Sequence, residues 1–313
     1  MTDTTRRLQS YEQLRRRTAS RHRISAVLPS ADPLAHSPRH LSDPEGSVLY
    51  LSHSQPDRLV VFVHGFWGGA LKTWQHFPES GLTRGWWRAS DMLFVGYPSG
   101  SESISGTAYR LCQQLPRFFP DLPQGLLEER GASVRPPAMA PYSELLLVGH
   151  SLGGVVVRRA LCEAAHSWIE QRKADAQASR PTLLGAETRL FSPASAGFRP
   201  SGRLGQIKAI PLFWRLCMIK LQGSSDFNDL QERSQILTDT RKRTEEFVSQ
   251  HSDELCGALR AHILWANPEN IVVTEHYTTD HPPCSADGTN HLSVCKPDDN
   301  YQIPWRFVET GQR

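Results

Sequence analysis

The sequence has no long hydrophobic run and only six cysteines in 313 residues. No stretch of 18 consecutive apolar residues occurs, so a membrane-spanning helix is not expected. The first residues are charged where a secretory signal needs an apolar core, and the cysteines lack the spacing of a disulfide framework. These absences predict a soluble, cytoplasmic chain with reduced thiols.

A strong excess of charge of one sign is also missing, since the formal net charge is +3. Residues 1–25 hold seven arginines against Asp3 and Glu12, so the remaining chain has two more acidic than basic residues. A basic surface for nucleic acid is therefore not predicted. Residues 1–45 have few apolar side chains, which indicates a flexible basic extension. A transit peptide and an anchor for an anionic surface are the alternatives for it.

The remaining residues, 46–313, predict one α/β domain, because buried strand-like runs alternate with helical patterns. The expected strands lie at 47–52, 58–64, 91–97, 144–149, 188–191 and 262–266, and the expected helices at 104–115, 154–171 and 238–259. This alternation predicts a mostly parallel central sheet flanked by helices. Two segments interrupt it: a Pro-rich insertion at 118–142 and an apolar lid or cap at 192–236.

A serine lies in a turn between one expected strand and the next helix. The run GHSLG at 149–153 separates the buried strand at 144–149 from the helix at 154–171. Such a turn lifts a serine hydroxyl clear of the sheet toward a base, and glycines relieve the crowding around it. The context predicts Ser151 as a nucleophile. The alternative is a serine that only caps the helix.

A second glycine-containing turn, VHGFWGG, follows the strand at 58–64. Acyl transfer turns a carbonyl oxygen into an anion, which two backbone N–H groups can stabilise. We predict that Phe66 and Leu152 supply these donors and that His64 holds the loop. A phosphate-binding loop is not predicted, because Lys72-Thr73 lacks a preceding glycine.

A histidine late in the chain must supply the base. The run DGTNHLSVCKP places His291 after a turn, from which its imidazole can reach the nucleophile, and His281 and His276 are the substitutes. The acid that orients the base is predicted at Glu269, shortly after the strand at 262–266. Asp280 is the alternative acid.

The same late segment contains a second pattern. His281, Cys284, His291 and Cys295 are residue types that bind zinc, but their spacings are irregular and no C-x-x-C pair is present. We therefore predict no metal and no cofactor. A structural zinc at these four residues is the alternative, and it would remove His291 as the base.

Together, the runs HGFWGG, VGHSLGGVVVRRAL, SPASAGF and TNHLSVCKP resemble the lipase-like serine esterases of the α/β-hydrolase superfamily, which are related to GPI inositol-deacylase-like hydrolases. The similarity covers residues 58–297. It implies an α/β-hydrolase fold, Ser151 as nucleophile, Phe66 and Leu152 as oxyanion donors, and His291 as base. It places the acid at Glu269, where such families more often have Asp. The insertion at 118–142 departs from the family pattern.

The apolar stretch at 207–221 bears on the substrate. As a lid it would line an acyl-chain pocket, which favours a lipid or long-chain acyl ester, although an ordinary core helix explains it equally well. Lys208, Arg215 and Lys220 could contact a membrane surface or form the solvated side of a lid. Two other functions stay open: a deacylase acting on a thioester or amide of an acylated protein, and a catalytically silent hydrolase fold used for binding.

Overall fold

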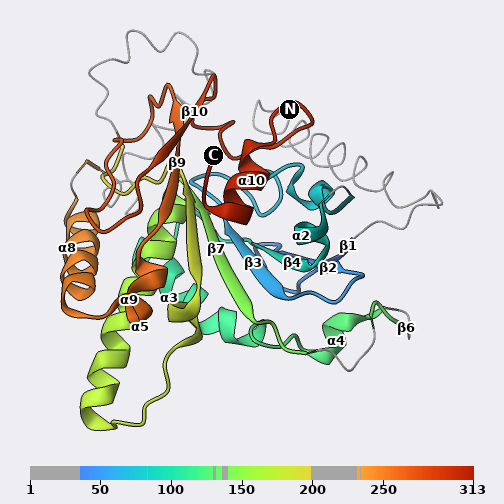
Figure 1. Ribbon diagram of the computed structural model, residues 1–313, viewed down its shortest axis with the longest axis horizontal. Helices are drawn as coiled ribbons and strands as arrows, with labels where there is room; N and C mark the ends of the chain where they lie inside the picture. The colour runs from blue at the N-terminus through green and yellow to red at the C-terminus, as the bar shows by residue number, and fades with distance from the viewer. Residues whose placement is uncertain (1–35, 83, 130–131, 136–139, 199–230, 233) are drawn as a thin grey trace, which may run out of the picture. The chain divides into compact units, whose positions relative to one another are not determined.

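Eight strands form one sheet in the order β1-β2-β4-β3-β7-β8-β9-β10 (Figure 1). The computed structural model describes residues 36–82, 84–129, 132–135, 140–198, 231–232 and 234–313. The strands of this sheet are β1 (His36–His40), β2 (Val48–Ser52), β3 (Arg58–Val63), β4 (Ser90–Val95), β7 (Glu144–His150), β8 (Glu187–Phe191), β9 (His262–Asn267) and β10 (Cys284–Asp287). Strand β2 is antiparallel to β1 and β4, and all other neighbours are parallel. The six predicted strands and the mostly parallel sheet are confirmed.

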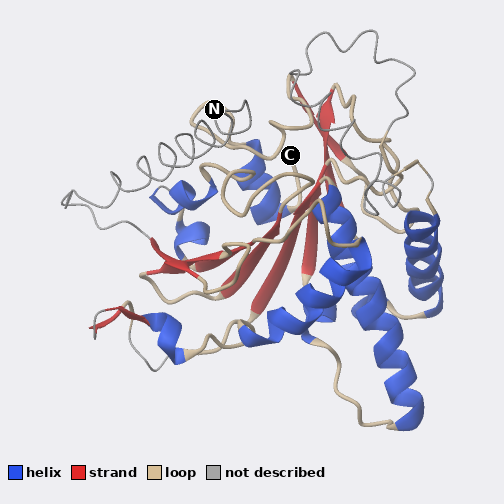
Figure 2. Cartoon of the chain, turned by 180° about the vertical axis from the view of Figure 1, so that it is seen from behind, coloured by secondary structure: helices blue, strands red, loops and turns tan. Residues whose placement is uncertain are grey.

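Helices cover both faces of the sheet (Figure 2). They are α2 (Gly85–Arg88), α3 (Ile104–Gln114), α4 (Gln124–Leu127), α5 (Leu152–Ala174), α8 (Gln235–Gln250), α9 (Asp253–Cys256) and α10 (Ile303–Thr310), with short 3-10 turns at Phe77–Leu82, Leu115–Arg117, Thr182–Gly185 and Gly257–Leu259. Helices α3, α5 and α8 pack on one face, and α2 and α10 on the other. No helix in the described part of the chain is long and apolar enough to cross a membrane.

The continuous apolar run of β3 follows from this double coverage. Successive side chains of a strand point to opposite faces, so Val61 packs in the core beneath α5, whereas Phe62 packs with Trp74 and Trp87 on the other side. All six residues of β3 are buried. Burial of each large apolar side chain stabilises the fold by about 1.5–3 kcal/mol.

The sheet begins earlier in the chain than the predicted domain boundary at residue 46. Strand β1 pairs antiparallel with β2, and the His36 ring hydrogen bonds the Ser90 carbonyl at 2.8 Å. Its sequence, HSPRH, has no apolar alternation. The strand lies at the sheet edge, where backbone pairing holds it. The α/β domain therefore includes residues 36–45, which the sequence analysis assigned to the extension. Strand β10 and helix α10 were also not predicted.

Of the two segments predicted to interrupt the fold, the structure describes most of residues 118–142 and little of residues 192–236. Residues 118–142 contain α4 and a small antiparallel pair, β5 (Glu128–Glu129) and β6 (Ala132–Ser133). Arg135 and Tyr142 both hydrogen bond Asp91, which is fully buried on β4 and anchors the insertion to the sheet. Most of the predicted lid at 192–236 lies outside the described residues.

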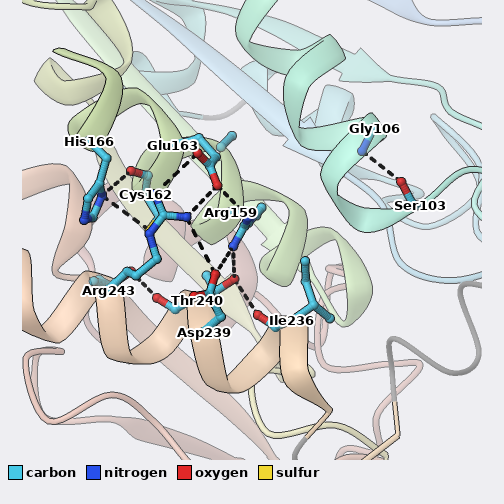
Figure 3. A network of polar contacts seen from close by, with 12 residues as sticks. Ser103, Gly106, Arg159, Cys162, Glu163, His166, Ile236, Asp239, Thr240 and Arg243 are labelled. Carbon is cyan, nitrogen blue, oxygen red and sulfur yellow. Dashed lines mark hydrogen bonds and ion pairs between the residues drawn. The ribbon is translucent and has the colours of Figure 1, made fainter. Parts of the chain in front are cut away.

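Helix α8, which follows this segment, is tied to α5 by charged side chains (Figure 3). Arg159 lies 2.7 Å from Asp239, and Arg243 lies 2.8 Å from Glu163. Residues of both helices therefore share one polar network on this side of the sheet.

Candidate active site

Ser151 directly follows β7 and precedes α5, in a backbone conformation that L-residues rarely adopt. Its φ is 55° and its ψ is −121°, and such a conformation costs about 1–3 kcal/mol. The turn leaves no space for side chains on either side: a Cβ at Gly153 would lie 2.0 Å from the Val63 carbonyl oxygen, and one at Gly149 2.7 Å from the Gly154 Cα. The Ser151 hydroxyl does not cap α5, so the capping alternative is wrong.

The Ser151 hydroxyl and the Glu269 carboxylate contact opposite nitrogens of one imidazole. His291 Nε2 lies 2.9 Å from Ser151 Oγ, and His291 Nδ1 lies 3.0 Å from Glu269 Oε2. A carboxylate only accepts, so Nδ1 carries the proton and Nε2 is free to accept the proton of the serine. The three residues follow the carboxyl ends of β7, β9 and β10, and all three are buried. The structure thus brings together the three residues favoured from the sequence.

The Glu269 carboxylate is held in its charged form. One oxygen accepts from the N–H groups of Ile271 and Val272, at 2.9 and 3.3 Å, while the other faces His291. Burial by itself would raise the pKa of Glu269. The hydrogen bond and charge of His291, with hydrogen bonds from the Ser192 hydroxyl and the Ile271 N–H, outweigh burial and lower this pKa to about 2. The group is therefore ionised at neutral pH.

The turn after β3 packs directly against Ser151. A Cβ at Gly65 would lie 2.8 Å from the Ser151 Cβ, so only glycine allows this approach. The Ser99 hydroxyl accepts the N–H of Trp67 at 2.9 Å. The His64 ring stacks on the ring of Tyr97. In the described ranges, the N–H groups of Phe66 and Leu152 donate to no protein acceptor. The arrangement can therefore offer two amides beside Ser151, as an oxyanion site requires.

Asp280, the alternative acid, lies in a different cluster. Its two oxygens bind the two terminal nitrogens of Arg158, at 3.1 and 2.6 Å, and both side chains are almost fully buried. The same carboxylate accepts the N–H groups of Ala261 and Tyr277. The Asp280 carboxylate is thus fully hydrogen bonded to groups other than His291, and it joins α5 to the loop before β10.

His291 is the candidate zinc ligand that contacts Ser151, and the other candidate ligands and the substitute bases have different surroundings. His281 stacks on His262 at the start of β9, with ring centroids 3.8 Å apart, and His276 is exposed. The Sγ of Cys295 is buried, 3.6 Å from the Thr73 carbonyl oxygen. Over the described ranges of the chain, no three side chains of metal-ligand type come together as a metal site.

Sequence reasoning missed one polar contact at the site, that of His150. Its Nε2 lies 2.8 Å from the main-chain oxygen of His291. The signal was its place directly before Ser151 in VGHSLGG, at the end of a buried strand, where a histidine needs a hydrogen-bond partner.

Comparison with known proteins concerns the fold and the region that holds the two glycine-containing turns. Residues 53–184, which include both glycine-containing turns, match the family model described as "Putative serine esterase (DUF676)". Esterase B of Lactobacillus rhamnosis, a solved structure, is 12% identical with a TM-score of 0.52, over 98% of this chain and 95% of that one. This likeness shows the fold.

Two further solved structures are similar at lower TM-scores. A lipase of Bacillus licheniformis is 16% identical over 90% of this chain and 96% of its own, with a TM-score of 0.47. Naproxen esterase of Bacillus subtilis is 13% identical over 89% and 87%, with a TM-score of 0.42. No curated protein sequence matches the chain significantly. The chain therefore has the α/β-hydrolase fold, and its residues 53–184 are similar to a serine esterase family.

Proposed function

We propose that the protein hydrolyses a carboxylic ester through an acyl-enzyme formed on Ser151. The observation that carries the proposal is the continuous hydrogen-bond chain from Ser151 Oγ through His291 to the Glu269 carboxylate. A serine hydroxyl becomes a good nucleophile only when an adjacent base takes its proton, and His291 Nε2 is within reach of that proton. Ionised Glu269 then stabilises the imidazolium that forms.

The two half-reactions use the same groups. Ser151 Oγ bonds to the ester carbonyl carbon while its proton moves to His291 Nε2, and the carbonyl oxygen becomes an anion. The intermediate collapses when His291 returns that proton to the leaving alkoxide, which departs as an alcohol. Water then attacks the acyl carbon, gives a proton to His291, and releases the carboxylic acid as the proton returns to Ser151.

The N–H groups of Phe66 and Leu152 are proposed to bind the oxyanion in both steps. They come from two different turns that meet where Gly65 packs on Ser151. Each such donor typically lowers the barrier by about 3 kcal/mol, because it is already oriented when the charge develops.

The proposed substrate is a lipid or another long-chain acyl ester, with peripheral contact to a membrane surface. This part of the proposal rests on the sequence, in which nine large apolar residues lie between 207 and 221, beyond the end of β8. An apolar lid at this place would enclose an acyl chain and exclude water from the ester. Three basic residues within the same stretch would face anionic headgroups.

Labelling and a chain-length series test the proposal. A fluorophosphonate probe should label the wild type and not Ser151→Ala, and equal labelling of both overturns the serine mechanism. With Ser151→Ala as the blank, kcat/KM on p-nitrophenyl esters should rise from acetate to palmitate. A decline along that series contradicts the long-chain substrate, and turnover of acyl thioesters or amides alone points to a deacylase.

A further inference from the structure

The residue before the nucleophile contacts the main chain of the residue proposed as the base. His150 is the last residue of β7, and its Nε2 lies 2.8 Å from the carbonyl oxygen of His291. A carbonyl only accepts, so His150 Nε2 carries a proton and donates it. The two rings lie 4.9 Å apart, and both residues are buried.

This contact joins two separate loops. The loop that carries His291 is braced internally by Asn290, whose side-chain oxygen accepts the N–H groups of Leu292 and Ser293 at 2.9 and 3.2 Å. Those bonds shape the loop but do not fix its distance from β7. The hydrogen bond from His150 does, since it runs from the residue next to Ser151 to the residue that must face Ser151.

His150 also contacts the turn that carries a proposed oxyanion donor. A Cβ at Gly65 would lie 3.0 Å from His150 Nδ1, and the Trp74 ring packs edge-on against the imidazole at 6.3 Å. The nucleophile turn, the base loop and the turn after β3 therefore meet at this side chain. A displacement of His150 would therefore change the packing of all three segments.

The charge state of His150 suits a fixed donor. Burial, and then the neighbouring His291, lower the pKa of His150 to about 3, while the other charged groups acting on it are Glu269, which raises it, and Lys296, which lowers it. The His150 ring is therefore neutral near neutral pH. It keeps the proton on Nε2 and takes no part in the proton transfer from Ser151.

We propose that His150 is a positioning residue, which sets the approach of His291 to Ser151 by holding the His291 main chain beside the nucleophile turn. The inference rests on the proposed function of Ser151. A displacement of about 1 Å between reacting groups can cost about 100-fold in rate, so this hydrogen bond acts on kcat more than on substrate binding.

Substitutions at His150 test the inference against a matched control. His150→Phe keeps a flat ring without the donor, and should lower kcat and the fluorophosphonate labelling rate about 10-fold to 100-fold, with KM within about threefold. His150→Gln, whose amide nitrogen reaches the place of Nε2, should recover most of the rate. His166→Phe, on α5 and in contact with Phe247, should leave the rate unchanged.

A second pair keeps the test decisive if His150→Phe does not fold. The amide of His150→Asn is too short to reach the His291 carbonyl, so it should be slower than His150→Gln by at least about tenfold. Equal rates for the Asn and Gln variants overturn the inference, as does wild-type labelling by a folded His150→Phe. If the wild type shows no Ser151-dependent labelling, the proposed function fails as well.

Discussion

Two buried carboxylates follow β9 along the chain, and they have different partners. Glu269 faces the imidazole of His291, whereas Asp280 binds the guanidinium of Arg158 at two points. The exposed fraction of the carboxylate side chain is 1% for Glu269 and 0% for Asp280. The two carboxylates are thus equally buried, and they differ in the side chain that each one binds. An imidazole gains and loses a proton near neutral pH, but a guanidinium does not. Only the first pair can take part in proton transfer; the second can only hold elements together.

The largest difference between the two pairs should appear in the catalytic rate. Glu269→Gln keeps the shape of the side chain but removes the charge that fixes and stabilises the His291 imidazolium. We expect kcat on a p-nitrophenyl ester to fall by about a thousandfold to ten-thousandfold. Asp280→Asn is the matched control, and its kcat per folded molecule should equal that of the wild type. The reverse pattern would make Asp280 the acid.

Stability should show the opposite order. Asp280→Asn leaves the Arg158 guanidinium buried without its counter-charge, which should lower the free energy of unfolding by about 3–5 kcal/mol. Urea denaturation measures the change. Asp253→Asn is the control, since Asp253 also pairs with an arginine but its side chain is 84% exposed, and it should cost less than about 1 kcal/mol. Equal losses in the two variants would show that burial of the Arg158 pair has no such effect.

Acid should weaken the contribution of Glu269 in a defined range. Its pKa in the folded protein is about 2, below the ordinary value of 4.5. Because the folded-state pKa is the lower one, the stabilisation is present above pH 4.5 and is lost as the pH falls toward 2. Its upper limit is about 3 kcal/mol.

The free energies of unfolding of the wild type and Glu269→Gln should therefore approach each other between pH 4.5 and pH 2. Denaturant titrations at several pH values in this range measure the gap. A gap that does not change with pH would show that the carboxylate is not held in its charged form.

Ser151 and the two carboxylates differ in how well their surroundings could be predicted from the sequence. The placement of Ser151 in a turn between a buried strand and a helix was predictable, because both elements leave strong local patterns. The preference for Glu269 over Asp280 rested on its short distance from β9 in the chain, whereas the partners that separate the two carboxylates lie on distant segments. Arg158 stands 122 residues before Asp280 and has no local link to it.

Parts of the fold were missed for a related reason. Strands β1 and β10 are short edge strands, and backbone pairing holds them in the sheet. In β10 only Ala286 is buried, so its sequence shows no run of apolar residues. Neither strand has the apolar pattern on which a sequence-based prediction depends.

The smallest effect is expected where carboxylates are neither buried nor in contact with His291. In the network between α5 and α8 (Figure 3), Arg243 lies 2.8 Å from Glu163, but the two side chains are 26% and 41% exposed. Water and salt screen such a pair, so a double-mutant cycle with Arg243→Gln and Glu163→Gln should give a coupling of about 0.2–1 kcal/mol that falls as salt is added. The catalytic rate should not change. A coupling as large as the loss expected for Asp280→Asn, about 3–5 kcal/mol, would show that burial does not decide what an ion pair contributes in this protein.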